Sequence, residues 1–288
     1  MNPDSTLFIV NPISGKGASS KSGIVSFLKK EGCEVVFTEK AGHAIELARN
    51  SSADTVVAVG GDGTVNEVAT GLAGTGRTLG IIPCGSGNGL ARHLGISMRF
   101  RKAYEQLKSG CAVPLDEGFI DGRPFFSACG VGLDAMVSEK FAKSGSRGLK
   151  TYIRESFNVW HNFIPERYAI TLDGTLIERE AALVSINNSN QWGNGVKVAP
   201  QARTDDGLLD VTIVKMFHTV EAPVLLARLL DGTFWKSVRV EHFKASSVSI
   251  LRESDGPAHC DGEYMEAGPK LEISIIPAAL RVISGRRN

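Results

Sequence analysis

The stretch Val56–Ile96 contains one pattern twice: a short apolar run, a glycine-rich turn and the start of a helix. The first copy has the run Val56–Val59 and the turn Gly60–Thr64, and the second has Leu79–Pro83 and Cys84–Asn88. Short apolar runs of this kind are typical of strands that are buried on both faces of a parallel sheet. Two such units in succession predict a parallel sheet with helices on its faces.

The two turns also suggest a ligand. Glycine leaves backbone N–H groups open to a bound anion, and a helix N-terminus adds partial positive charge. Turn geometry alone explains a single glycine-rich turn about as well as phosphate binding does. Two turns in succession, which carry Asp62, Thr64 and Ser86, favour phosphate binding.

Two further strand and helix pairs come earlier in the chain. Residues 7–10 and 35–37 are predicted strands, and helices are predicted around residues 24–28 and 44–48. Ligands of parallel sheets sit beyond the carboxyl ends of the strands. The loops at Asn11, Thr38, Gly61 and Ser86 are therefore expected to converge on one crevice.

After about Leu115 the pattern changes to strand-like runs with few helices. The runs are residues 168–172, 182–186, 209–214, 247–251 and 271–276, and helical patches cover 149–163 and 220–230. We predict a nucleotide-binding α/β domain over residues 1–124 and a β-rich, mainly antiparallel domain over residues 125–288. The last residues either stay in the second domain or return to the first. A cleft between two domains is the default active site.

Composition narrows the class of protein. A formal net charge of +1 argues against nucleic acid as the main partner. The chain lacks the roughly 18 uninterrupted apolar residues of a membrane span, and its N-terminus does not resemble a secretory signal. Five scattered cysteines without a C-x-x-C pair suggest free thiols in a reducing cytoplasm.

Several motifs together resemble the diacylglycerol kinase catalytic-domain family, which includes bacterial lipid kinases and the sphingosine and ceramide kinases. They are Asn11-Pro12-x-Ser14-Gly15, Gly60-Gly61-Asp62-Gly63-Thr64-Val65-Asn66-Glu67, Pro83-x-Gly85-Ser86-Gly87-Asn88 and Asp261-Gly262-Glu263. The resemblance implies an N-terminal domain like that of NAD kinases and a β-rich lipid-substrate domain. It also implies ATP- and Mg²⁺-dependent transfer of the γ-phosphate to a lipid hydroxyl, of the diacylglycerol or sphingoid type.

The first domain holds the predicted nucleotide site. Asp62 is expected to contact Mg²⁺ or its bound water, since it would repel a phosphate directly; capping of the helix that follows is a compatible alternative. Lys16 is a weaker candidate for phosphate contact. The residues expected to bind the nucleotide are Asn11, Thr38, Gly61, Asp62, Gly63, Thr64, Asn66, Glu67 and Ser86.

Asp261 and Glu263 are the candidates for catalysis. From the residues alone, Asp-Gly is a common hairpin turn. The resemblance implies instead that this pair abstracts the hydroxyl proton or contacts metal at the reacting phosphate, and it does not decide which carboxylate is the base.

Two other carboxylates carry expectations that the resemblance supplies. Asp206, with the carbonyl groups of Arg203 and Leu208, matches a structural magnesium site of the bacterial members, and the alternative is a solvated turn. Asp134 matches an aspartate that holds the lipid head group in sphingosine kinases. As a carboxylate in an apolar run it needs either a substrate or a structural hydrogen-bond donor.

The expected partner is a lipid at a membrane surface. The protein is expected to be a cytoplasmic enzyme that binds the membrane peripherally, and either a monomer or an oligomer is compatible with the sequence. The basic residues Lys140, Lys143, Arg147 and Lys150 either form a solvated helix face or dock on anionic head groups. Two alternatives remain: a small-molecule kinase of the NAD kinase type, and a catalytically idle lipid-binding regulator.

Overall fold

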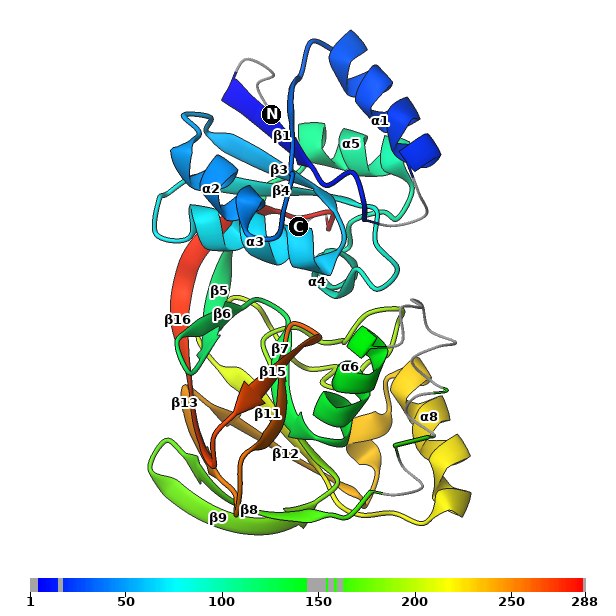
Figure 1. The fold of residues 1–288 in the computed structure, drawn as a ribbon, viewed down its shortest axis with the longest axis vertical. Coiled ribbons are helices and arrows are strands. Elements are labelled where there is room, and N and C mark those ends of the chain that lie inside the picture. Colours follow the sequence, from blue (N-terminus) through cyan, green and yellow to red (C-terminus); the bar gives the residue numbers. More distant parts are fainter. Residues whose placement is uncertain (1–4, 15–17, 144–153, 155–157, 160–162, 287–288) are drawn as a thin grey trace. The chain divides into compact units, whose positions relative to one another are not determined.

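The computed structural model describes residues 5–14, 18–143, 154, 158–159 and 163–286. The chain divides into two compact units (Figure 1). The first unit comprises Met1–Leu115 together with Ala278–Asn288, and the second comprises Asp116–Pro277. Lys16, most of the predicted helical patch 149–163, and Arg147 and Lys150 of the basic stretch lie outside the described residues.

The first unit is an α/β fold with a parallel sheet, as the repeated strand and helix pattern predicts. Its strands lie in the order β2, β1, β3, β4, and each neighbouring pair is parallel. The strands are β1 (Thr6–Val10), β2 (Glu34–Phe37), β3 (Thr55–Gly60) and β4 (Thr78–Pro83), and the helices are α1 (Ala18–Lys30), α2 (His43–Asn50), α3 (Asp62–Leu72), α4 (Gly89–His93) and α5 (Phe100–Ser109).

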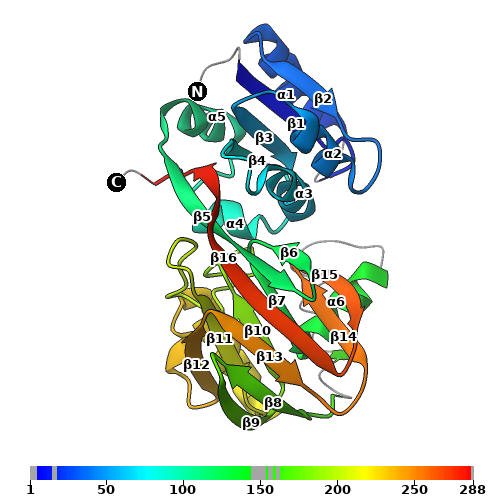
Figure 2. The same cartoon turned by 90° about the vertical axis from the view of Figure 1, so that its left-hand side faces the viewer.

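Helices cover both faces of this sheet (Figures 1 and 2). On one face, Phe8, Val57 and Ile82 from three strands pack with Leu28 of α1 and Leu107 of α5 in one hydrophobic cluster. Helices α2 and α3 pack against each other and against the strands of the other face. Strand β1 is buried along its whole length, which explains why β1, β3 and β4 are continuous apolar runs.

The second unit is built mainly from antiparallel strands, as predicted. One sheet has the order β12, β11, β10, β7, β14, β15, and the other contains β16, β13, β8 and β9. The strands are β6 (Arg123–Phe125), β7 (Ala128–Gly132), β8 (Glu166–Leu172), β9 (Thr175–Ala181), β10 (Leu183–Asn187), β11 (Leu209–Val214), β12 (Val240–Ala245), β13 (Ser247–Leu251), β14 (Gly256–Cys260) and β15 (Glu263–Ala267), and the helical elements are α6 (Leu133–Lys143), η2 (Thr219–Glu221), α8 (Ala222–Asp231) and η3 (Phe234–Lys236).

Two long strands run through both units. They are β5 (Ala112–Ile120) and β16 (Lys270–Ile283). The first part of β16 pairs with β13 in the second unit, and its end pairs in parallel with β4 of the first unit through Arg281 and Val282. The core of the second unit draws on both of its sheets, for example through Val131, Val211 and Ile250.

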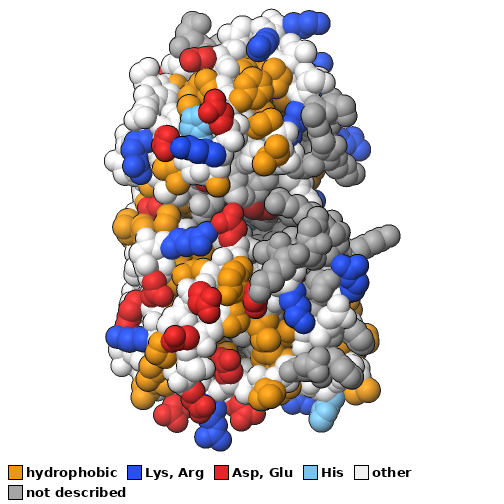
Figure 3. Space-filling view, viewed as in Figure 1, with side chains coloured by type: hydrophobic (Ala, Val, Ile, Leu, Met, Phe, Trp, Pro, Cys, Tyr) orange, Lys and Arg blue, Asp and Glu red, His pale blue; other side chains and the backbone are white. Residues whose placement is uncertain are grey.

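Three further observations concern the surface charges, the cysteines and the helix lengths. Acidic and basic side chains are scattered over the face shown in Figure 3. All five cysteines are free thiols. Within the described part of the chain, every helix is too short or too polar to cross a membrane.

The buried Glu117 gives a prediction about pH and stability. Its residue is 6% exposed, and burial raises the pKa of its carboxyl to about 7. A carboxyl with a raised folded-state pKa stabilises the fold below its unfolded pKa, and this contribution is lost as the pH rises through about 7. Glu117→Gln removes the ionisable group, so it should raise the unfolding free energy at pH 8.5 by roughly 3 kcal/mol relative to wild type.

Urea unfolding of both proteins at pH 5.5 and 8.5 measures this difference. Glu180→Gln, on the exposed part of β9, is the matched control and should change neither value. An equal effect of the two substitutions would contradict the assignment.

Candidate functional site

A carboxylate joins the two glycine turns of the first unit. Helix α3 begins at Asp62, directly after the N-cap residue Gly61. The two oxygens of the Asp62 side chain accept the backbone N–H groups of Asn88 and Gly89, each at 2.7 Å. The two strand, turn and helix units are therefore tied together at the carboxyl edge of the sheet.

Close backbone packing explains the glycines of these turns. A Cβ atom on Gly85 would lie 2.6 Å from the Cα atom of Gly61, and one on Gly87 would lie 2.9 Å from Asp62 Oδ2. Asn88 adopts φ 52°, and its side chain bonds both the N–H and the carbonyl group of Gly85. The amides of Gly85, Asn88 and Gly89 thus bond within the chain, and Ser86 stands exposed at the tip.

The loop after β1 connects to the first turn of α3. Asn11 Nδ2 donates to Thr64 Oγ1 at 3.0 Å, and the Asn11 backbone N–H donates to the carbonyl of Val59. Thr38 is buried and follows β2, where its N–H bonds the carbonyl of Val10. Asn11, Thr38, Asp62 and Thr64 therefore lie at the same edge of the sheet, as parallel strands require.

Glu67 has a different environment from the other predicted nucleotide residues. Its carboxylate accepts the backbone N–H groups of Gly42 and Ala44 at 2.9 and 3.1 Å. These groups start α2, so Glu67 acts as a cap for a neighbouring helix. Gly63 and Asn66 lie in the first turns of α3 and are half-buried.

A buried lysine at this edge is not apparent from sequence. Lys21 of α1 is 4% exposed, and its ammonium donates to the Asn11 carbonyl and to Ser14 Oγ. Burial lowers the pKa of Lys21 and raises that of the nearby Cys84 thiol. Burial of this lysine is not predictable from the sequence, because a lysine among serines is typical of the solvated face of a helix.

In the second unit, Asp134 forms a buried pair with His259. Asp134 lies in the first turn of α6, and its Oδ2 lies 3.0 Å from His259 Nε2. The side chains are 3% and 5% exposed. The carboxylate that sequence reasoning left without a partner has a structural one, and among the described residues His259 Nδ1 has no hydrogen-bond partner.

Asp261 and Glu263 have contrasting surroundings. Asp261 follows β14 with φ 49°, and its carboxylate accepts the N–H groups of Phe126, Ser127 and Ala128 at 2.8–3.0 Å. Glu263 begins β15 and forms an exposed ion pair with Arg123 at 2.7 Å. Asp261 is therefore held in place by backbone, whereas Glu263 has a solvent-exposed partner.

Asp206, the carboxylate of the predicted structural metal site, forms an ion pair with Lys244. Asp206 Oδ2 accepts the Lys244 ammonium at 2.7 Å, and Asp206 Oδ1 accepts the backbone N–H of Leu208. The Arg203 side chain pairs with Asp205. Asp210 is fully buried, with an oxygen 3.5 Å from the same ammonium. A magnesium ion at Asp206 would compete with Lys244 for this carboxylate.

Asp62 is the other carboxylate that is expected to contact magnesium. Within the described residues no cluster of three or more His, Cys, Asp or Glu side chains could hold a metal ion by itself. Magnesium is usually held by one or two carboxylates together with substrate phosphates and water. A single aspartate between glycine turns is compatible with this mode.

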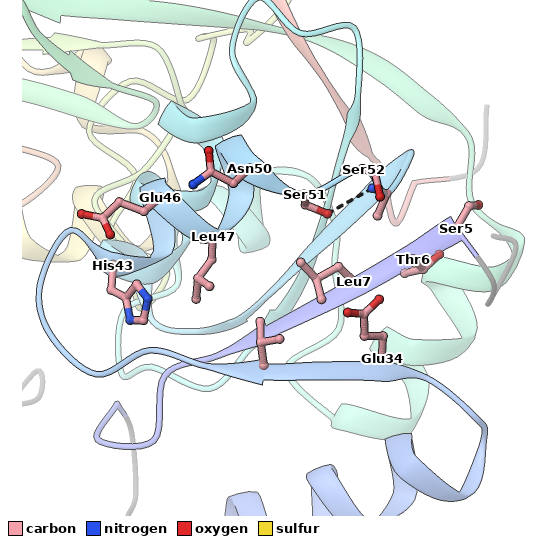
Figure 4. Close-up of a pocket in the computed structure, with 12 residues that line it drawn as sticks. Ser5, Thr6, Leu7, Glu34, His43, Glu46, Leu47, Asn50, Ser51 and Ser52 are labelled. Carbon is pink, nitrogen blue, oxygen red and sulfur yellow. Dashed lines mark hydrogen bonds between the residues drawn. The ribbon is translucent and has the colours of Figure 1, made fainter.

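The hollow shown in Figure 4 lies at the other edge of the first unit's sheet. Its volume is about 490 Å³, and Thr6, Glu34 and Ala53 at the amino ends of three strands line it, together with His43 and Asn50 of α2. Ligands of parallel sheets bind at the carboxyl ends, so this hollow does not coincide with the glycine turns.

Comparison with known proteins covers both units. Residues 5–120 match the family model of the diacylglycerol kinase catalytic domain, and residues 127–284 match that of the YegS C-terminal NAD kinase beta sandwich-like domain. The chain is 30% identical to a diacylglycerol kinase of Mycobacterium tuberculosis strain H37Rv over 96% of its length and 94% of that protein. It is also 30% identical to a diacylglycerol kinase of Bacillus subtilis strain 168, over 89% of the chain and 88% of that protein.

Solved structures show the same fold. A putative diacylglycerol kinase from Bacillus anthracis superposes with a TM-score of 0.81 at 26% identity, over 97% of this chain and 96% of that one. An NAD kinase from Archaeoglobus fulgidus in complex with ATP superposes with a TM-score of 0.54 at 12% identity, over 98% and 94% of the two chains. The second likeness concerns the fold alone.

The contact between Lys244 and Asp206 predicts how magnesium affects stability. Lys244→Met frees the carboxylate for a divalent cation. Without nucleotide, Mg²⁺ a few times above its dissociation constant should raise the melting temperature of this variant by roughly 2–4 °C and that of wild type by less. Lys215→Met, which breaks the neighbouring ion pair with Glu241, is the control. An equal response of wild type and Lys244→Met would show that magnesium binds without displacing the lysine.

Proposed function

The chain belongs to the diacylglycerol kinase family, and from that premise we propose that it is a lipid kinase. It transfers the γ-phosphate of ATP to a lipid hydroxyl of the diacylglycerol or sphingoid type, with Mg²⁺ as cofactor. The observation that supports this most directly is the 30% identity with diacylglycerol kinases over 96% of the chain. That similarity spans the glycine turns of the first unit and the Asp-Gly-Glu segment of the second.

The first unit is proposed to hold the nucleotide. Phosphoryl transfer needs donors for the phosphates, a divalent metal and a positioned acceptor hydroxyl. Side chains and amides at the carboxyl edge of the sheet supply the donors: Asn11, Thr38, Gly61, Gly63, Thr64, Asn66 and Ser86. Glu67 supports this set through its cap on α2. Asp62 would hold Mg²⁺, which neutralises charge on the phosphates when bound.

The second unit is proposed to supply the acceptor side. Asp261 or Glu263 takes the proton of the lipid hydroxyl as its oxygen attacks the γ-phosphorus and the bond to the ADP oxygen breaks. Three amides orient Asp261. Asp134, held by His259, is the proposed contact for the polar head of the substrate.

A lipid acceptor also implies a place of action. We propose that the protein works as a peripheral enzyme at a membrane surface on the cytoplasmic side. Lys140, on α6, is exposed, and it is the member of the basic stretch whose side chain the structure describes. Each cation near an anionic surface adds about 1 kcal/mol of attraction.

An acceptor panel tests the proposed reaction. Purified protein with labelled ATP and Mg²⁺ should phosphorylate at least one of diacylglycerol, monoacylglycerol, sphingosine, ceramide and phosphatidylglycerol in mixed micelles. Chelation of Mg²⁺ should abolish transfer. Asp62→Asn should reduce it by roughly 10²-fold or more, because loss of the charge weakens the proposed contact with Mg²⁺ and the hydrogen bonds with the amides of Asn88 and Gly89. Transfer to NAD without transfer to any lipid would contradict the proposal.

Substitutions in the Asp-Gly-Glu segment distinguish a catalytic base from a residue that only supports the structure. Glu263→Gln should lower turnover by roughly 10²- to 10⁴-fold if Glu263 is the base, with an unchanged melting temperature because its ion pair is exposed. Asp261→Asn should lower both turnover and unfolding free energy, the latter by about 1–3 kcal/mol, since three amides lose a charged acceptor. Arg123→Met breaks the same ion pair without removing a carboxylate, and it is the control. Wild-type turnover in both carboxylate variants would refute the assignment.

A further inference from the structure

Lys21 has an unusual environment for a lysine in a surface helix. It lies in α1, its residue is 4% exposed, and its ammonium donates to the carbonyl of Asn11 at 2.6 Å and to Ser14 Oγ at 3.1 Å. Both acceptors are neutral. Ser14 is itself buried, so the ammonium lies against the loop that follows β1.

The charge of this ammonium is not balanced by the protein as described. Across the described ranges, no Asp or Glu oxygen is recorded within ion-pair distance of Lys21, whereas other lysines such as Lys244 and Lys270 have carboxylate partners. Buried charges are normally paired, because desolvation of a lone charge is expensive. Burial accordingly lowers the pKa of Lys21. An anion that binds here would relieve this penalty.

The neighbours of Lys21 belong to the edge that carries the glycine turns. Asn11, whose carbonyl accepts the ammonium, donates through Nδ2 to Thr64 in the first turn of α3. Cys84, which opens the second glycine turn, is close enough to interact electrostatically with Lys21. Burial raises the pKa of this thiol, so Cys84 stays neutral and does not supply the missing negative charge.

The second glycine turn offers little to an anion in place of Lys21. Its Asn88 and Gly89 amides already donate to the Asp62 carboxylate, and the Gly85 amide donates to Asn88 Oδ1. Asp62 itself adds negative charge to the edge. These three amides are not available to a polyphosphate, and Lys21 supplies positive charge at the same edge.

We infer that Lys21 binds the phosphate chain of the nucleotide while it holds the Asn11–Ser14 loop in place. The inference rests on the proposed function for the identity of the ligand, a nucleoside triphosphate. A lysine ammonium acts as a point charge with three donors. Two donors bind the loop, and the phosphate receives the third.

Direct binding measurements on the full chain test this. Lys21→Gln keeps a polar donor for the loop and removes the charge, and Lys21→Arg keeps the charge. Isothermal titration with ATP, tripolyphosphate and adenosine, all with Mg²⁺, should show a roughly 10- to 100-fold loss of affinity for ATP and tripolyphosphate in Lys21→Gln, since a charged hydrogen bond is removed. Adenosine affinity should not change, and Lys21→Arg should keep most of the ATP affinity.

Controls separate a phosphate contact from a purely structural brace. Lys29→Met, on an exposed position of the same helix, should bind all three ligands as wild type does. Equal losses for ATP and adenosine in both Lys21 variants, with lower melting temperatures, would overturn the inference. If Lys21→Gln does not fold, Lys21→Met takes its place in the comparison with Lys21→Arg. The quantity measured is then the increase in melting temperature that tripolyphosphate causes, which should be smaller in Lys21→Met.

The same measurements keep the two proposals apart, because binding does not require turnover. Lys21-dependent binding of ATP and tripolyphosphate without phosphorylation of any lipid would refute the proposed function and leave this inference standing. Lipid phosphorylation by a Lys21→Gln variant that binds ATP like wild type would refute the inference alone.

Discussion

The contact between Asp62 and the second glycine turn is the interaction on which the candidate nucleotide site depends. One carboxylate accepts two backbone N–H groups at 2.7 Å, and hydrogen bonds to a charged acceptor are about twice as strong as neutral ones. The contact is possible only because Gly61 and Gly85 bring two backbones to a distance that a Cβ atom would prevent. The glycines are therefore needed for the close packing of the two turns, whether or not a ligand is bound.

This arrangement has an electrostatic consequence for the same edge of the sheet. The Asn88 and Gly89 amides of the second turn donate to Asp62, so their partial positive charge is directed into the protein. The positive charge left for an anion comes from the first turn of α3 and from Lys21, whose ammonium has only neutral acceptors among the described residues. Under the proposed function, Asp62 would face the magnesium ion and the Lys21 ammonium the polyphosphate, so this edge would carry a charge for each part of the complex.

Local patterns in the sequence predicted the α/β unit well and the contacts of the second unit poorly. Strands β1, β3 and β4 are apolar runs because helices cover both faces of their sheet. By contrast, β7 has the sequence Ala-Cys-Gly-Val-Gly. Its small residues are as typical of a loop as of a strand. The partner of Asp134 is 125 residues away in the chain and is set by the antiparallel register that places His259 opposite Gly130. Likewise, Lys244 reaches the Asp206 loop because it pairs with Asp210 across β11 and β12. Such pairings depend on strand register, which periodicity does not encode.

The four carboxylates singled out in the second unit differ in what holds them, and this difference bears on catalysis. Asp134 has a buried imidazole, Asp206 has an ammonium and Asp261 has three amides. Glu263 has an arginine whose side chain is 42% exposed, and its own side chain is 61% exposed. Ion pairs at the surface contribute about 0–1 kcal/mol, whereas removal of a buried charged partner costs several times more. Glu263 is therefore the member of this set that changes partner most easily. Under the proposed function, a proton acceptor that meets an incoming hydroxyl needs that freedom, which favours Glu263 over Asp261 as the base. The three amides that Asp261 accepts are suited to hold the segment that carries Glu263.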